Sequence, residues 1–61
     1  MKNNYRVDVY FRGRCYSTEF AEYWLAKVFA DAIQNDKEVE NVYMLERMTS
    51  TGEFDIIRRI K

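Results

Sequence analysis

The segment Tyr-Arg-Val-Asp-Val-Tyr-Phe-Arg-Gly, residues 5–13, decides the fold of this chain. Apolar and aromatic residues occupy every odd position from 5 to 11, whereas the even positions are mostly charged. Such alternation among β-branched and aromatic residues is typical of a strand with one buried face, so we predict a strand over residues 5–12. Glycine adopts positive φ at little cost, and Gly13 is therefore expected to turn the chain into a short second strand, residues 14–16.

A helix is predicted to follow this hairpin and to begin near residue 18. Either Ser17 or Thr18 can accept a hydrogen bond from an unpaired N–H of the first turn, where Glu19 and Glu22 would add favourable negative charge. Asn35-Asp36 then ends the helix. One apolar stripe is expected to face a sheet. It comprises Ala21, Leu25, Val28, Phe29 and Ala32, with Trp24 and Ile33 at its margins, and Glu19, Lys27, Asp31 and Gln34 lie opposite.

Two aromatic residues near the start of this helix, Phe20 and Tyr23, fall outside the stripe. We expect them to pack beneath the preceding strand, for example against Tyr16, and the alternative is a binding site. Trp24 is expected to belong to the core, with its indole N–H at the rim.

The C-terminal part of the chain predicts a second hairpin. Residues 39–48 and 54–60 are two apolar runs, separated by a polar segment in which Gly52 takes the left-handed position of the turn. The fold class is therefore a two-layer α+β domain of order ββαββ, in which one helix packs across a largely antiparallel sheet of three or four strands. We expect a single domain over residues 1–61. Strand order stays open. If the two hairpins paired with each other through the first and last strands of the chain, these two strands would be parallel at the centre of the sheet, as in small β-grasp domains.

Composition excludes several classes of function. The 61 residues include one cysteine and no histidine, so the chain cannot form an internal disulfide, a zinc finger or a Ser-His-Asp arrangement. Cys15 beside Arg14 could be a reactive thiol, but a small packed strand residue is the simpler interpretation because no base or resolving cysteine accompanies it. The scattered carboxylates are typical of a solvated surface. We therefore expect no enzymatic activity, no cofactor and no metal site.

The sequence also predicts no membrane association and a cytoplasmic location. No apolar run approaches the roughly 18 residues of a membrane span. The opening residues 1–4 lack the apolar stretch of a secretory signal, and a lone cysteine suits a reducing compartment.

Charge is divided unevenly along a chain whose formal net charge is zero. Residues 1–18, which include Lys2, carry a net charge of +3, residues 19–46 carry −5, and residues 47–61 carry +2. The predicted strands are thus basic at both ends of the chain, and the helix with its exit is acidic. A dipolar particle is expected, with a positive sheet side and a negative helix side.

One helix covers only one face of a sheet, so the other face should expose apolar and aromatic residues among arginines. Whether Val42 and Met44, or instead Tyr43 and Leu45, point inward stays open. In the last strand, Phe54 and Ile56 are expected to share one face and Ile57 the other. The candidate interaction surface comprises Arg6, Tyr10, Arg12, Tyr43, Leu45, Arg47, Ile57 and Arg59.

Three interpretations compete for this surface. A homodimer would bury apolar area by sheet-to-sheet packing or by pairing of edge strands. A single-stranded nucleic acid could stack on Tyr10 and Tyr43 while arginines meet its phosphates, although a pI near 6.2 is low for such a binder. An unidentified larger protein could contact the aromatic patch or the acidic helix. We predict a non-enzymatic protein-interaction module that forms a homodimer. Its size suits a small regulator or inhibitor of the kind that phages and mobile elements encode. The alternative is weak binding of single-stranded nucleic acid.

Overall fold

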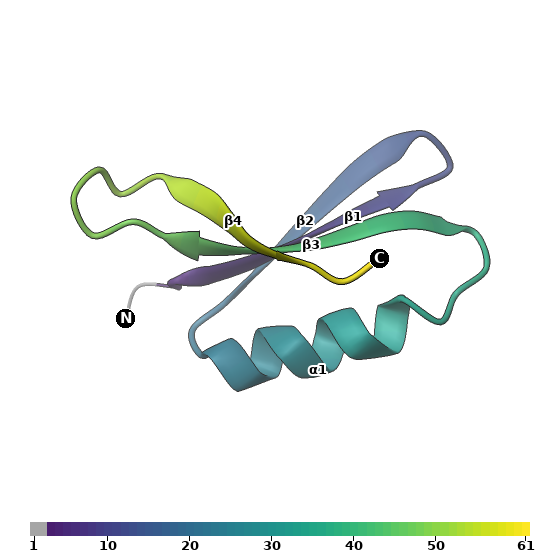
Figure 1. The fold of residues 1–61 in the computed structure, drawn as a ribbon, viewed down its shortest axis with the longest axis horizontal. Coiled ribbons are helices and arrows are strands. Elements are labelled where there is room, and N and C mark those ends of the chain that lie inside the picture. The colour runs from purple at the N-terminus through teal and green to yellow at the C-terminus, as the bar shows by residue number, and fades with distance from the viewer. Residues whose placement is uncertain (1–2) are drawn as a thin grey trace.

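The computed structural model describes residues 3–61 and contains one antiparallel sheet with a helix on one of its faces (Figure 1). This arrangement confirms the predicted two-layer α+β fold with the order ββαββ. Lys2, which was counted in the basic N-terminal segment, lies outside the described residues. The elements are β1 (Tyr5–Phe11), β2 (Arg14–Phe20), α1 (Tyr23–Ile33), β3 (Val39–Arg47) and β4 (Phe54–Arg59).

The sheet has the strand order β2-β1-β3-β4, and all neighbouring strands are antiparallel. The two hairpins therefore join through β1 and β3, and the parallel pairing of the first and last strands considered above is wrong. The physical reason is burial: β1 and β3 contain the buried residues of the sheet, whereas β2 and β4 contain none. Central strands are covered by neighbours along both edges, so the two most apolar strands take the central places.

Both predicted glycine turns are confirmed. Arg12 and Gly13 form a two-residue loop in which both residues have positive φ, 51° and 76°, the signature of a type I′ hairpin. β1 consequently ends at Phe11, one residue earlier than predicted. Gly52 also has a φ of 76°, and its N–H donates to the Met48 carbonyl oxygen at 2.8 Å.

The second strand and the start of the helix differ from prediction. β2 extends to Phe20, and α1 begins only at Tyr23, with Glu22 at the N-cap position. Ser17 is therefore a strand residue rather than a helix cap, and its hydroxyl donates to Asp8 at 2.7 Å. Every residue of β2 pairs with a residue of β1, and this complete ladder replaces the local preference of Ser17 and Thr18 for a helix start.

The side of α1 that faces the sheet is also not the predicted one. Ala26 and Ala30 are fully buried, and Phe29 and Ile33 pack partly against the core. Of the predicted stripe, Val28 is 61% exposed and Leu25 is exposed as well. Alanines at the contact let the helix backbone approach closely, while the sheet supplies the bulky side chains that fill the interface.

The core lies between α1 and the two central strands, where Val7, Val42 and Met44 are completely buried. Aromatic contacts close its ends. Phe20 packs on Phe29 with 5.4 Å between ring centroids, and Tyr23 meets Tyr5 edge to face at 5.7 Å. Phe20 thus packs within the fold, whereas Tyr23 contacts Tyr5 but stays 40% exposed, and neither contact is with Tyr16.

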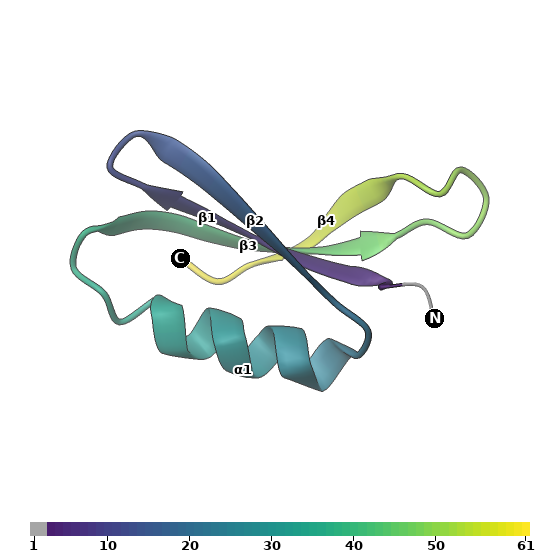
Figure 2. The same ribbon diagram turned by 180° about the vertical axis from the view of Figure 1, so that it is seen from behind.

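The molecule is elongated because the β3–β4 hairpin projects beyond the helix (Figures 1 and 2). The radius of gyration is 11.3 Å, compared with about 10.5 Å for an average compact chain of this length. No residue of β4 is buried, and the helix packs against β1, β2 and β3. The helix therefore covers only part of the sheet and leaves β4 largely exposed.

Candidate interaction surfaces

The sheet face that points away from α1 contains six of the eight predicted surface residues. Val42 and Met44 lie in register with Val9 and Val7 on the helix side, which places Tyr43, Leu45 and Arg47 on the other side. This resolves the alternative left open by the sequence. The outer sheet face contains Arg6, Tyr10, Tyr43, Leu45, Arg47 and Arg59 from the predicted set.

Arg12 and Ile57 do not belong to the outer sheet face. Arg12 lies in the hairpin turn, where its guanidinium bonds the Glu38 carboxylate at 2.6 Å. Ile57 lies at a β-bulge, because Met44 pairs with Arg58 and Leu45 with Ile56, so that Ile57 has no partner across the ladder. Phe54 and Ile56 share one face, as predicted, but it is the outer face that had been expected for Ile57, and Ile56 is 58% exposed there. Arg59 lies on the same face as Phe54 and Ile56 rather than opposite them, because the bulge at Ile57 shifts the alternation by one residue.

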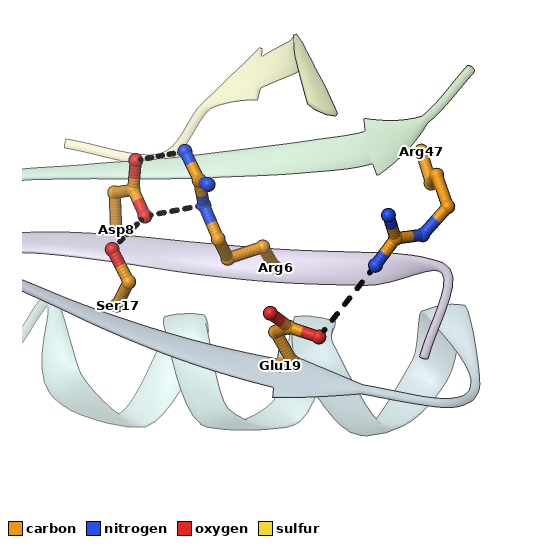
Figure 3. Close-up of polar contacts among 5 residues, drawn as sticks. All are labelled: Arg6, Asp8, Ser17, Glu19 and Arg47. Carbon is orange, nitrogen blue, oxygen red and sulfur yellow. Dashed lines mark hydrogen bonds and ion pairs between the residues drawn. The ribbon is translucent and has the colours of Figure 1, made fainter. Parts of the chain in front are cut away.

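An ion pair between the partly exposed Arg6 and the buried Asp8 lies in the middle of the outer sheet face (Figure 3). The Arg6 Nη2 donates to Asp8 Oδ2 at 3.0 Å, and Arg6 Nε lies 2.9 Å from Asp8 Oδ1. The Ser17 hydroxyl donates to Asp8 Oδ1 at 2.7 Å, the oxygen that Arg6 Nε also approaches. A buried carboxylate needs such partners, since a carboxylate without them would be strongly destabilising. This group therefore ties β1 to β2.

Arginine side chains cover the apolar part of the same face. The guanidinium of Arg47 lies 4.4 Å from the centroid of the Phe54 ring, and that of Arg6 lies 4.9 Å from it. Arg47 also reaches within 3.8 Å of the Glu19 carboxylate (Figure 3). Leu45 is only 5% exposed. Arg6 and Arg47 are thus engaged within the molecule, and Leu45 is part of its interior rather than of its contact surface.

The two tyrosines of this face contact each other edge to face, with 5.9 Å between the centroids of Tyr10 and Tyr43. The Cys15 side chain beside Tyr10 is the main cause that raises the pKa of the Tyr10 phenol, and burial adds to it. Cys15 itself is exposed. In an edge-to-face pair, the edge of one ring covers a face of the other ring. This pair therefore leaves one ring face fewer for stacking than two separate, open rings would.

A second apolar surface, which the sequence interpretation assigned to the core, lies on the side of α1 that points away from the sheet. Its largest member, Trp24, is 59% exposed, and the indole N–H donates to the Glu22 carboxylate at 2.5 Å. A Lys27–Asp31 ion pair at 2.6 Å borders it. We call this surface the α1 outer face, and it comprises Trp24, Leu25, Val28 and Ala32.

One signal in the sequence could have revealed the α1 outer face. Residues 24–33 contain two apolar stripes at helical spacing: one runs through Leu25, Val28 and Ala32, and the other through Ala26, Ala30 and Ile33. A helix packed on a single sheet buries only one stripe. Two stripes therefore indicate either complete burial, which a chain of this size cannot provide, or a surface for another molecule.

A cavity of about 260 Å³ opens between α1 and the edge strand β2. Its lining is mostly apolar, with Thr18 and Asp36 as the polar members. The helix packs more extensively on β1 and β3 than on β2, so the helix-side face of β2 is only partly covered. The cavity is lined by Val9, Phe11, Tyr16, Thr18, Phe29, Ile33, Asp36 and Val39.

Within residues 3–61, Cys, Asp and Glu side chains form no group of three or more that could hold a metal ion. The same described residues contain no helix with the length and apolarity needed to cross a bilayer. Comparisons with protein-family models, with curated proteins and with solved structures found no match to this chain. The arguments that follow therefore rest on the surfaces of the molecule.

Proposed function

We propose that this protein is a small non-enzymatic protein-interaction module that inserts the α1 outer face into an apolar groove of a larger protein. The observation that carries the proposal is the exposure of Trp24 and Val28 on a helix whose opposite side is buried. Apolar side chains that gather on one exposed surface indicate that another molecule covers this surface. Such a module suits a regulator or inhibitor of its partner.

The spacing of these residues fits the way in which helices bind grooves. Leu25, Val28 and Ala32 follow the i, i+3, i+7 pattern by which an amphipathic helix presents its anchors. Trp24 lies one turn before Val28 and adds the side chain that is most enriched among interface hot spots. α1 is held on a sheet, so its helical conformation is formed before binding and costs little entropy on association.

Charge defines the chemistry of the partner. The charged residues from the N-cap to the end of α1 are Glu22, Lys27 and Asp31, one cation against two carboxylates, a net charge of −1. Asp31 pairs with Lys27, and Glu22 lies directly beside the α1 outer face, where it bonds Trp24. A groove whose rim carries lysine or arginine would complement these carboxylates, and a groove with an acidic rim would be repelled. The expected partner is therefore a protein with an apolar groove and a basic rim.

The outer sheet face supports a nucleic-acid function less well. Phosphate binding by Arg6 and Arg47 would compete with their contacts to Asp8 and Glu19. The rings of Tyr10 and Tyr43 meet edge to face, whereas stacking of bases uses open ring faces. These contacts favour the α1 outer face as the docking surface.

Two residues of nearly equal exposure allow a matched test. Val28 is 61% exposed on α1, and Ile56 is 58% exposed on the outer sheet face. A photo-crosslinking amino acid is placed at either position, and the protein is irradiated in an extract of its own cells. The protein crosslinked through position 28 is then purified and titrated with the wild type, with Val28→Lys and with Ile56→Lys.

We expect one specific crosslinked protein from position 28 and none from position 56. Val28→Lys should weaken binding roughly 30-fold or more, a loss as large as that of an interface hot spot, because it replaces an apolar contact in the groove with a charge. Ile56→Lys should bind like the wild type. Both variants should keep the wild-type circular dichroism. The proposal is wrong if no protein is crosslinked from position 28, if Val28→Lys binds normally, or if the product from position 28 is a pair of identical chains.

A further inference from the structure

The two edge strands of the sheet differ in how well they are protected. β4 has six residues, a register shift opposite Met44 and Leu45, and the adjacent cations Arg58 and Arg59. Bulges and charges of this kind discourage pairing with another strand. β2 has seven residues, each in regular register with β1, and it contains no proline. Only β2 therefore presents a straight and unprotected edge within the described residues.

The charged residues of β2 do not block this edge. Glu19 points to the outer sheet face, where it lies near Arg47, and Arg14 is the first residue of the strand. On the helix side, Tyr16 is 52% exposed and Thr18 is exposed too, and both line the 260 Å³ cavity. A strand added beside β2 would place alternate side chains over this apolar cavity.

We propose that the occupant of this edge is a second copy of the chain, paired antiparallel through β2 so that two four-stranded sheets become one continuous sheet. The two-fold axis passes midway between Ser17, the central residue of β2, and Ser17 of the second copy. In this register all seven residues of each strand find a partner. Symmetric pairing of this kind forms a closed dimer and leaves no unprotected edge.

The side chains of β2 complement their own copies in this register. Arg14 lies opposite Phe20 of the second copy, Cys15 opposite Glu19, and Tyr16 opposite Thr18. No like charges face each other, and an arginine beside an aromatic ring is favourable. Tyr16 of each copy would extend over the mouth of the partner's cavity beside Thr18. The zero formal net charge of the chain adds no long-range repulsion between copies.

The test is the native mass in solution, measured by light scattering over a dilution series. Thr18→Lys places a charge on the helix side of β2 at the interface, and because Thr18 is exposed in one copy the substitution should leave the isolated fold intact. Ile57→Lys places the same charge on the opposite edge strand and is the matched control. Val28→Lys changes the α1 outer face and separates this inference from the proposed function.

We expect the wild type, Ile57→Lys and Val28→Lys to show twice the mass of the 7.4 kDa chain, and Thr18→Lys to show the mass of one chain. Amide hydrogen exchange provides a second measurement that needs no variant: on dilution, the outward amides of β2 should lose protection and those of β1 should keep it. A monomeric wild type, or a dimer that dissociates with Ile57→Lys or Val28→Lys but not with Thr18→Lys, overturns the proposal. A dimer with unprotected β2 amides overturns it too.

Discussion

Ala26 and Ala30 determine how closely α1 approaches the sheet. Both are fully buried, and they lie one turn apart on the same side of the helix. A larger side chain at either position has no space unless the helix moves outward and loses its contacts with Val7 and Met44.

Ala30→Leu should therefore lower the free energy of unfolding by about 1–3 kcal/mol, the usual cost of overpacking a core. Ala32→Leu adds the same atoms on the α1 outer face, where the effect should stay within about 0.5 kcal/mol. Urea unfolding followed by circular dichroism measures both. Equal losses in the two variants would mean that α1 does not face the sheet through Ala30.

At the scale of the element, α1 begins without a side-chain cap. Glu22 has the extended backbone of an N-cap residue, φ −126° and ψ 146°, yet its carboxylate bonds the Trp24 indole instead of the N–H groups of the first turn. The helix also has no acidic residue in its first turn and no basic residue in its last turn. Packing of its buried side therefore contributes more to its stability than its ends do.

Glu22→Asp should improve this start, because the shorter side chain of aspartate can reach the N–H of the second or third helical residue. We expect the free energy of unfolding to rise by about 0.5–1 kcal/mol. Glu22→Ala is the control and should not be more stable than the wild type. Thermal unfolding of the three proteins tests this, and a less stable Glu22→Asp would show that the bond to Trp24 contributes more than a cap.

At the scale of the whole molecule, the core is small. Its completely buried large side chains are Met44, Val7 and Val42, and no residue of β2 or β4 is buried. A domain of about 60 residues is marginally stable alone, so association with a second copy should add substantially to its stability.

If folding and pairing through β2 are linked, the melting temperature should depend on concentration. Each tenfold increase in protein concentration should stabilise a protomer by about 0.7 kcal/mol, which corresponds to roughly 3–6 °C for a domain of this size. Thr18→Lys should melt at a temperature that does not vary with concentration. Scanning calorimetry at several concentrations checks this, and a constant melting temperature for the wild type would count against linked folding and pairing.

The sequence by itself determined the features that depend on local patterns. Alternation over residues 5–11 defines β1, and Gly13 and Gly52 mark the two turns because each occupies a left-handed backbone conformation that few other residues adopt. The two hairpins around one helix then determine the α+β class. Arg6 and Tyr10 were also placed on the correct face, since a period of two leaves only two choices in a strand and β1 has only one apolar face. For Tyr43 the same two choices stayed open, because both faces of residues 39–48 contain apolar residues.

Tertiary structure alone decided the features that depend on distant partners. β2 extends through Ser17 and Thr18 because β1 provides a complete ladder beside it, although both residues also suit a helix start. The bulge that moves Ile57 out of alternation exists only in the pairing of β3 with β4. Residues 24–33 contain two apolar stripes, and close packing on the sheet selected the one with the smaller side chains. That selection left Trp24 and Val28 exposed. Local periodicity cannot predict which stripe is buried, because both stripes have the same period.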